Sequence, residues 1–201
     1  MTLDLYNAVA GRIQPVDIIA LWGAASDPLK PSEDLSWVIE HIAEFRDGVG
    51  KEEKSPSHIV VVRQPRIEGR DVLGIESTIT HGRNGVQNNP LGAILTGYPK
   101  GSTAAWFQLD APARARVDLA AFYECCGQNE GRTHYSIQQL VQFLLPDWID
   151  QRIVPHNAMV CSVWGGAALR ASKAAPDIVP WEQTPADIIC LPIFNKPVRI
   201  L

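Results

Sequence analysis

A run of β-branched residues most constrains the fold of this 201-residue chain. Residues His58 to Val62 read His-Ile-Val-Val-Val, and consecutive β-branched side chains of this kind favour a strand. After a turn, residues Val72 to Thr78 have the same character, so the two segments are expected to pair antiparallel. The fold is therefore expected to contain an antiparallel β-sheet.

The remaining elements are predicted from shorter apolar patterns and from turn and capping residues. Short apolar runs bounded by turns predict further strands at residues 17–22, 86–87, 104–109 and 187–191. Apolar residues at helical spacing predict helices at residues 32–48, 114–126, 136–145 and 161–171. Ser32 and Ser136 are the expected N-caps, and Gly127 is expected to end the second helix. No repeat or linker divides the chain, which predicts one α+β domain over residues 1–201, with a mostly antiparallel sheet packed against helices.

The composition argues against a nucleic-acid-binding protein. Lys and Arg number 18 and Asp and Glu 22, giving a net charge of −4, and there is no basic run. No apolar run reaches the roughly 18 residues of a membrane-spanning helix, and Asp4 and Asp17 stand where a signal peptide would have basic and apolar residues. We expect a cytoplasmic protein with reduced cysteines; delivery by another route stays open, as does the oligomeric state.

Three polar residues fall on predicted elements that are otherwise apolar: His58, Glu76 and Cys161. Side chains of a strand alternate between its two faces, so His58 shares a face with Val60 and Val62. By the same rule Glu76 shares a face with Gly74 and Thr78 on the second strand. Facing strands can thus set a carboxylate against an imidazole, which leaves the other ring nitrogen for a thiol.

Cys161 lies in the first turn of its predicted helix. The unpaired N–H groups and the positive end of the helix dipole favour a thiolate over a thiol at this position. Gly165 and Ala168 put small side chains on the same helical face. The helix is therefore expected to pack close to the sheet and to bring Cys161 to the two strands.

Structural roles are the alternative for each of these residues. A lone cysteine in an alanine-rich helix is often a small buried hydrophobe, and a strand histidine or glutamate often has no catalytic role. The other histidines show no zinc-helix spacing and no cysteine pair completes a site, so no metal and no cofactor is expected. Cys125 and Cys126 are most simply the buried end of a helix, with a redox role as the lesser alternative.

The order of five short motifs gives a further indication. Along the chain these motifs are Val16-Asp17-Ile-Ile, Ser57-His58-Ile-Val-Val-Val, Ile75-Glu76-Ser-Thr with Gly85-Val86-Gln87, His134-Tyr135-Ser136 and Val160-Cys161-Ser162. In this order the sequence resembles the circularly permuted NlpC-like papain-fold cysteine hydrolases of the YiiX/YebB type, in which the histidine comes first and the nucleophile last. The resemblance spans roughly residues 15 to 194, and its specificity lies in the ordered combination.

This resemblance implies a permuted papain-like fold and a role for each of the three residues. Cys161 would be the nucleophile, His58 the general base and Glu76 the residue that orients His58. Asp17 matches the aspartate of the first motif and Tyr135 a later motif position, so both are expected at the substrate site. Two departures from the family pattern, Val16 for glycine and Ser77 for alanine, bear on loop shape.

Two classes of function follow from this interpretation. The first is a cysteine amidohydrolase or peptidase that cleaves an amide bond, of the peptide or cell-wall peptide type, through a thioester. An acyltransferase or lipid hydrolase of the same fold acting on acyl substrates is its variant. The second class is a catalytically silent module that binds a peptide or lipid. The presence of cysteine, histidine and glutamate in the family order favours the enzyme.

Overall fold

The computed structural model describes residues 3–23, 55–79, 84–135 and 158–201. These residues form an α+β structure around one six-stranded sheet with strand order β4-β3-β2-β1-β5-β6, in which every neighbouring pair is antiparallel. The strands are β1 Ile18–Trp22, β2 His58–Gln64, β3 Leu73–Thr78, β4 Gly85–Pro90, β5 Thr103–Phe107 and β6 Val198–Arg199. The helices are α1 Asp4–Val9, η1 Ala10–Arg12, α3 Leu91–Gly97, α4 Ala111–Arg116, α5 Leu119–Asn129, α7 Cys161–Ala171, η3 Pro180–Glu182 and α8 Pro185–Ile189.

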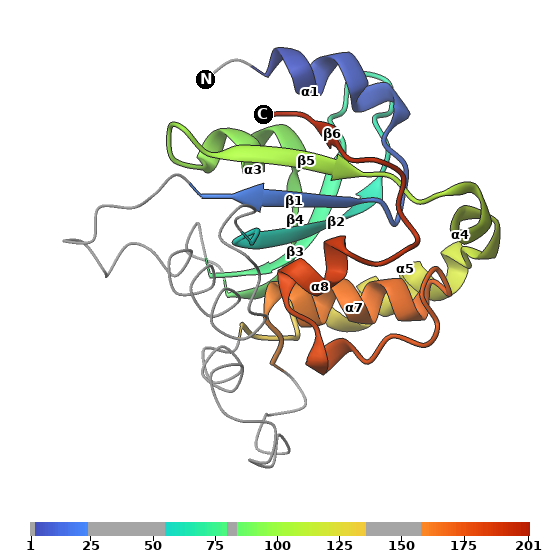
Figure 1. Cartoon of the computed structure of the whole chain (residues 1–201). Coiled ribbons are helices and arrows are strands. Elements are labelled where there is room, and N and C mark those ends of the chain that lie inside the picture. The colour runs from blue at the N-terminus through green and yellow to red at the C-terminus, as the bar shows by residue number, and fades with distance from the viewer. Residues whose placement is uncertain (1–2, 24–54, 80–83, 136–157) are drawn as a thin grey trace.

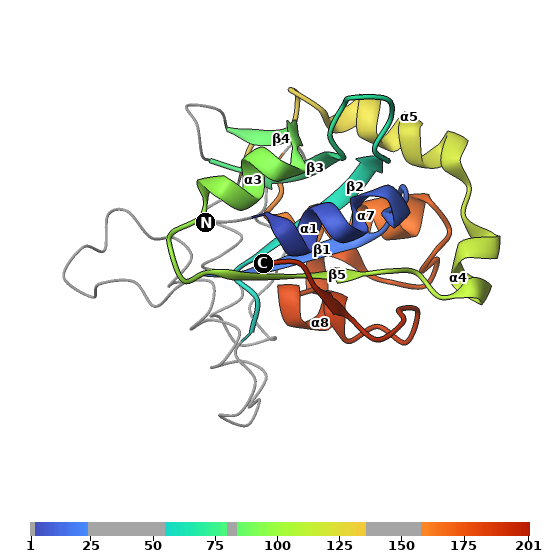
Figure 2. The ribbon, with the colours of Figure 1, turned by 90° about the horizontal axis from the view of Figure 1, so that it is seen from above.

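Helices cover both faces of the sheet, and this explains the continuous apolar run of β2. Ile59 and Val61 point into a core shared with Trp164 of α7, together with residues of α5 and α8. Val60 and Val62 point the other way, into a second core built with α1, α3 and the C-terminal residues. Figure 1 shows α5, α7 and α8 below strands β1 and β2 and α1 above them, and Figure 2 gives the view from above. Because neither face of β2 meets water, neither needs polar residues.

The predicted sheet is confirmed, with strands at five of the six predicted places and antiparallel pairing of β2 with β3. The predicted helix at residues 161–171 is also confirmed as α7. The predicted helices beginning at Ser32 and Ser136 lie outside the described residues. None of the helices in the described part of the chain combines the length and the hydropathy that a membrane span requires.

Two predictions of secondary structure are wrong. The strand expected at residues 187–191 is the helix α8, which begins with a capping box between Thr184 and Asp187. The single helix expected at residues 114–126 is two helices, because Asp118 caps a new helix by accepting a hydrogen bond from the Ala121 N–H. Gly127 consequently lies inside α5, which continues to Asn129. The elements α1, α3 and β6 were not predicted.

Candidate active site

The sheet brings His58 and Glu76 together. The register of β2 against β3 sets Val62 opposite Gly74, so the side chains of His58 and Glu76 share one face, close to the end of the sheet where β2 begins. The His58 Nε2 atom lies 2.6 Å from Glu76 Oε2, and the two side chains are only 9% and 5% exposed. An ionised carboxylate can only accept hydrogen bonds, so Nε2–H is the donor.

Two hydrogen bonds and one close packing contact fix the position of Cys161, the first residue of α7. Ser77 Oγ on β3 donates to the Met159 carbonyl at 2.6 Å, which fixes the chain two residues before Cys161. Trp164 Nε1 donates to the Ile75 carbonyl at 3.2 Å, which fixes the first turn of α7 to the same strand. At Gly165 a Cβ would come within 3.2 Å of Ile59 Cγ2, so the missing side chain lets the helix approach β2.

The Cys161 thiol is the third member of this cluster. Cys161 is buried, and its side chain lies close enough to His58 for its negative charge and hydrogen-bonding capacity to raise the pKa of the imidazole. Because Nε2 of His58 faces Glu76, Nδ1 is the ring nitrogen that is left for the sulfur. The structure therefore brings the three predicted residues together in the order thiol, imidazole and carboxylate.

Charge on both sides of His58 determines its protonation. Burial by itself lowers the pKa of His58, whereas the negative charge and hydrogen bonds of Cys161 and Glu76 raise it, and the net result is a pKa of about 10. The imidazolium form of His58 is therefore favoured at neutral pH. An imidazolium in this position is the proton donor that a leaving group of an attacked carbonyl needs.

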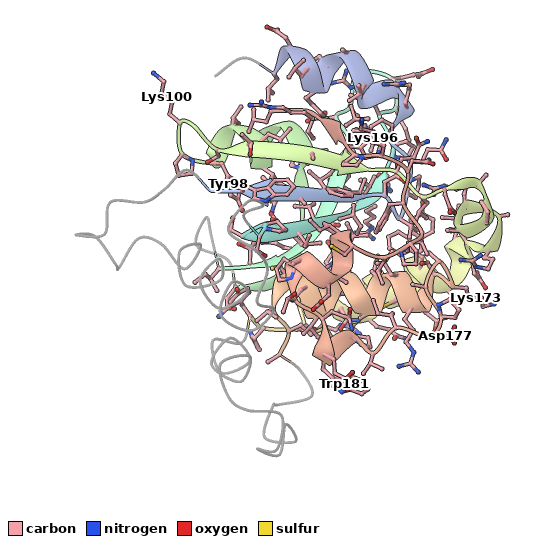
Figure 3. The ribbon with its side chains drawn as sticks, in the orientation of Figure 1. Tyr98, Lys100, Lys173, Asp177, Trp181 and Lys196 are labelled. Carbon is pink, nitrogen blue, oxygen red and sulfur yellow. The ribbon has the colours of Figure 1, made fainter. Side chains whose placement is uncertain are left out.

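Two further residues surround the imidazole and the carboxylate. Asn89 of β4 donates from Nδ2 to Glu76 Oε1 at 2.8 Å, so this oxygen is held independently of the one that faces His58. The Tyr98 ring lies 6.4 Å from the His58 ring, centroid to centroid, and is tilted by 33°. Figure 3 shows Tyr98 at the end of the sheet where β1 ends and β2 begins. No sequence pattern singles out Asn89, because only the register of β4 against β3 places it beside Glu76.

Tyr135 lies beside the chain that leads into α7. His134 pairs with Ala158 in a parallel bridge, and the Met159 N–H donates to the His134 carbonyl at 2.8 Å. The Tyr135 N–H donates to Asn84 Oδ1 at 2.7 Å. Burial, and secondly the negative charge of Cys161, raise the pKa of Tyr135 well above its usual value of 10. The Tyr135 hydroxyl is thus a neutral hydrogen-bonding group in the neighbourhood of the thiol.

Asp17, in contrast, is not part of this cluster. It precedes β1, whereas His58 pairs with Leu21 near the far end of the same strand. The fully buried Asp17 carboxylate accepts hydrogen bonds from the Trp106 indole at 2.9 Å and from the Leu109 N–H at 3.1 Å. It also pairs with the Arg114 guanidinium. These contacts tie β1 to β5 and α4, which gives Asp17 a structural role away from the cluster of Cys161, His58 and Glu76.

The other three thiols lie in different surroundings. Cys126 lies on the buried side of α5, and burial raises the pKa of its thiol to about 12. Burial also raises the pKa of Cys125, and Cys190 is exposed at the end of α8. A cavity of about 440 Å³ lies beside Asp177, which Figure 3 shows well away from Tyr98. Within the described residues, no group of three or more His, Cys, Asp or Glu side chains is arranged to hold a metal ion.

No model of a known protein family and no curated protein matches the sequence.

Proposed function

We propose that the chain is a cysteine hydrolase that cleaves an amide bond through a Cys161 thioester. The observation that carries the proposal is the buried contact of His58 with Glu76 at 2.6 Å, with the Cys161 side chain at the start of α7 close enough to the same imidazole to raise its pKa. A thiol, an imidazole and a carboxylate in this sequence of contacts are what nucleophilic catalysis by cysteine requires. A silent binding module would have no physical need for all three.

The reaction begins from a thiolate and an imidazolium. The Cys161 sulfur attacks the carbonyl carbon of the substrate and forms a carbon–sulfur bond, while the carbonyl electron pair moves to oxygen. When the tetrahedral intermediate collapses, the carbon–nitrogen bond breaks and His58 gives its proton to the leaving amine. The products of this half-reaction are the free amine and the acyl thioester on Cys161.

Hydrolysis of the thioester completes the cycle. The now neutral His58 takes a proton from a water molecule, whose oxygen attacks the thioester carbonyl. Collapse releases the carboxylic acid and restores the thiolate and the imidazolium. Glu76 stays ionised throughout and stabilises the positive charge on His58. In the acyltransferase variant, an alcohol or amine acceptor replaces the water.

The position of Cys161 at the start of α7 also supplies a hydrogen-bond donor for the negatively charged oxygen of the tetrahedral intermediate. The first N–H groups of a helix have no partner within the helix, and they point outward from its N-terminal end. The Cys161 N–H is accordingly the proposed donor to the negatively charged oxygen of the intermediate. Donors of this kind are worth roughly 10²–10³ in turnover.

We also propose that the fold is the papain-like arrangement in its permuted order. Two observations support this: the antiparallel sheet carries His58 and Glu76 on neighbouring strands, and the cysteine begins a helix packed against that sheet. Along the chain, the histidine comes first and the cysteine last, as in the family that the motifs resemble.

The first test compares the pH dependence of alkylation at Cys161 and Cys190. Iodoacetamide labelling at several pH values, followed by peptide mapping, gives a rate for each thiol. An ordinary thiol with a pKa near 8.5 loses roughly 100-fold in thiolate between pH 8 and pH 6. Cys190, exposed at the end of α8, is expected to follow that fall, whereas the rate of Cys161 is expected to fall less steeply, because the neighbouring His58 imidazolium favours a thiolate. Burial slows Cys161 equally at every pH, so the shape of the profile decides, and parallel profiles would contradict the proposal.

The second test asks for turnover. Purified chain is incubated with a panel of peptide amides and acyl esters, with Cys161→Ala as the inactive control. Release of amine that depends on Cys161 supports the amidohydrolase. Turnover of the esters alone would support the lipid-acting variant. An acyl adduct on Cys161, trapped at low pH and found by mass spectrometry, is expected with either substrate class.

A further inference from the structure

Asn89 holds the carboxylate that faces His58. Its Nδ2 atom donates to Glu76 Oε1 at 2.8 Å, while Glu76 Oε2 lies 2.6 Å from His58 Nε2. The two oxygens of one carboxylate therefore have different partners. A carboxylate bonded at both oxygens by separate donors cannot rotate without losing one of the two hydrogen bonds.

The register of the sheet explains why Asn89 reaches Glu76. Asn89 pairs with Gly74 on β3, and Glu76 lies two residues further along that strand on the same face. Such diagonal neighbours are within reach of a polar side chain, particularly because Gly74 has no side chain to stand between them. The end of β4 is fixed in turn, since the Leu91 N–H donates to the Val72 carbonyl at 2.8 Å.

The chemistry of an amide suits this position. An amide N–H is a neutral donor that stabilises a carboxylate in its ionised form and offers no proton of its own to transfer. The neighbouring Asn88 faces the other side of the sheet, where its amide bonds to Glu130. Of these two adjacent asparagines, only Asn89 contacts the cluster of Cys161, His58 and Glu76.

We propose that Asn89 is a positioning residue that keeps Glu76 ionised and directed at His58. This inference rests on the proposed function, because it assigns Asn89 a part in activating the Cys161 thiol. Asn89 touches no reacting atom and acts only through Glu76. Its loss should therefore move the pH at which Cys161 becomes reactive, which a residue that merely fills space would not do.

Two substitutions separate a donor from a space-filling side chain. Asn89→Ala removes the hydrogen bond, and Asn89→Asp keeps the shape but sets a second carboxylate against Glu76. The readout is the pH of half-maximal alkylation of Cys161 by iodoacetamide, which is a property of the coupled groups. We expect it to rise by roughly 0.5–1 unit in Asn89→Ala, as for one lost hydrogen bond. In Asn89→Asp it should rise by more than about one unit, because two adjacent carboxylates share a proton.

Asn88→Ala is the matched control, because it removes an amide from the same strand on the opposite face. Its alkylation profile is expected to coincide with that of the wild type. A profile of Asn89→Asp that matches the wild type, or moves less than that of Asn89→Ala, would overturn the inference. If circular dichroism shows Asn89→Asp to be unfolded, Asn89→Ala against Asn88→Ala decides: equal profiles overturn it and an upward shift in Asn89→Ala alone supports it.

A His58→Ala variant distinguishes failure of the inference from failure of the proposed function. If His58→Ala leaves the alkylation profile of Cys161 unchanged, His58 does not activate the thiol, and both the proposed function and the role of Asn89 fail. If His58→Ala moves the profile to that of an ordinary thiol while both Asn89 variants keep the wild-type profile, only the inference about Asn89 fails.

Discussion

The negative charge of Glu76 can be removed almost without changing its shape, by the substitution Glu76→Gln. The glutamine can still accept a hydrogen bond from His58 Nε2, which lies 2.6 Å from the present carboxylate oxygen. It cannot stabilise the positive charge of the imidazolium. Because both side chains are more than nine-tenths buried, water compensates little for the lost charge.

The structure sets the size of the effect. A charge-assisted hydrogen bond of this kind contributes roughly 1–3 kcal/mol, and two charges about 4 Å apart at an effective dielectric constant of 20 interact by about 4 kcal/mol. One pKa unit corresponds to about 1.4 kcal/mol, so the imidazolium is destabilised by a factor of roughly 10–10³. In the hydrolysis step the neutral His58 must gain a proton from water, so the lost charge of Glu76 slows this step, and we expect turnover to fall by up to the same factor. The comparable exchange in a serine triad costs about 10⁴, because there the charge pair forms only during the reaction.

The assay compares Glu76→Gln with the exposed exchange Glu124→Gln on α5. Turnover is measured on the amide identified from the panel, and alkylation of Cys161 at pH 6 is measured alongside it. Glu124→Gln should match the wild type in both. If Glu76→Gln is fully active, the carboxylate does not support His58. If it is as inert as Cys161→Ala, Glu76 takes part in the chemistry itself, and the assigned role is wrong in either case.

Three further predictions concern the frame of the site. Asp17→Asn should lower the free energy of unfolding, measured in urea titrations, by about 2–4 kcal/mol, because it leaves Arg114 without its buried charged partner. The control Asp4→Asn, at an exposed position, should change the free energy of unfolding by less than about 0.5 kcal/mol. Equal stabilities of the two variants would refute the structural role of Asp17. Gly85→Ala should lower the free energy of unfolding by more than about 3 kcal/mol, because φ at Gly85 is +104° and a Cβ there would overlap the Thr133 carbonyl oxygen. A variant as stable as the wild type would contradict this packing. The pKa of His58 is raised from 6.5 to about 10 on folding, so the stability that its own proton contributes is complete below pH 6.5 and is lost as the pH rises towards 10. Because the unfolded chain holds the Cys161 proton until about pH 8.5, the free energy of unfolding should show this loss between about pH 8.5 and pH 10. His58→Gln should remove this loss, and an unchanged pH profile of unfolding would show that the proton is not held.

The strands could be predicted because their pattern is local. Residues 59–62 are all apolar and β-branched and are buried on both faces of the sheet, so composition alone identifies β2. The same reasoning failed at residues 187–191, where Ile188, Ile189 and Cys190 resemble a short strand. A four-residue capping box, Thr184 to Asp187, begins a helix there instead. Periodicity could not separate the two, because the apolar run is shorter than two helical turns.

The site was predictable to the extent that it depends on alternation along a strand and on position in a helix. His58 and Glu76 follow from a period of two, and Cys161 from the start of a helix. The contacts of Asn89 with Glu76 and of Tyr98 with His58 join residues from different elements of the fold. No local sequence pattern predicts either contact. For Asp17, the motif position predicts a substrate contact. In the structure its buried carboxylate accepts a hydrogen bond from Trp106 and forms an ion pair with Arg114.

The central claim is that His58 carries a proton because Cys161 and Glu76 hold negative charge on either side of it. Nuclear magnetic resonance of the His58 ring, recorded as a pH titration in the wild type and in Cys161→Ala, tests it directly. We predict that the wild-type ring stays protonated through neutral pH and titrates near pH 10, and that the Cys161→Ala ring titrates at least one unit lower. Identical titrations in the two proteins, or a neutral His58 at pH 7 in the wild type, would contradict the account.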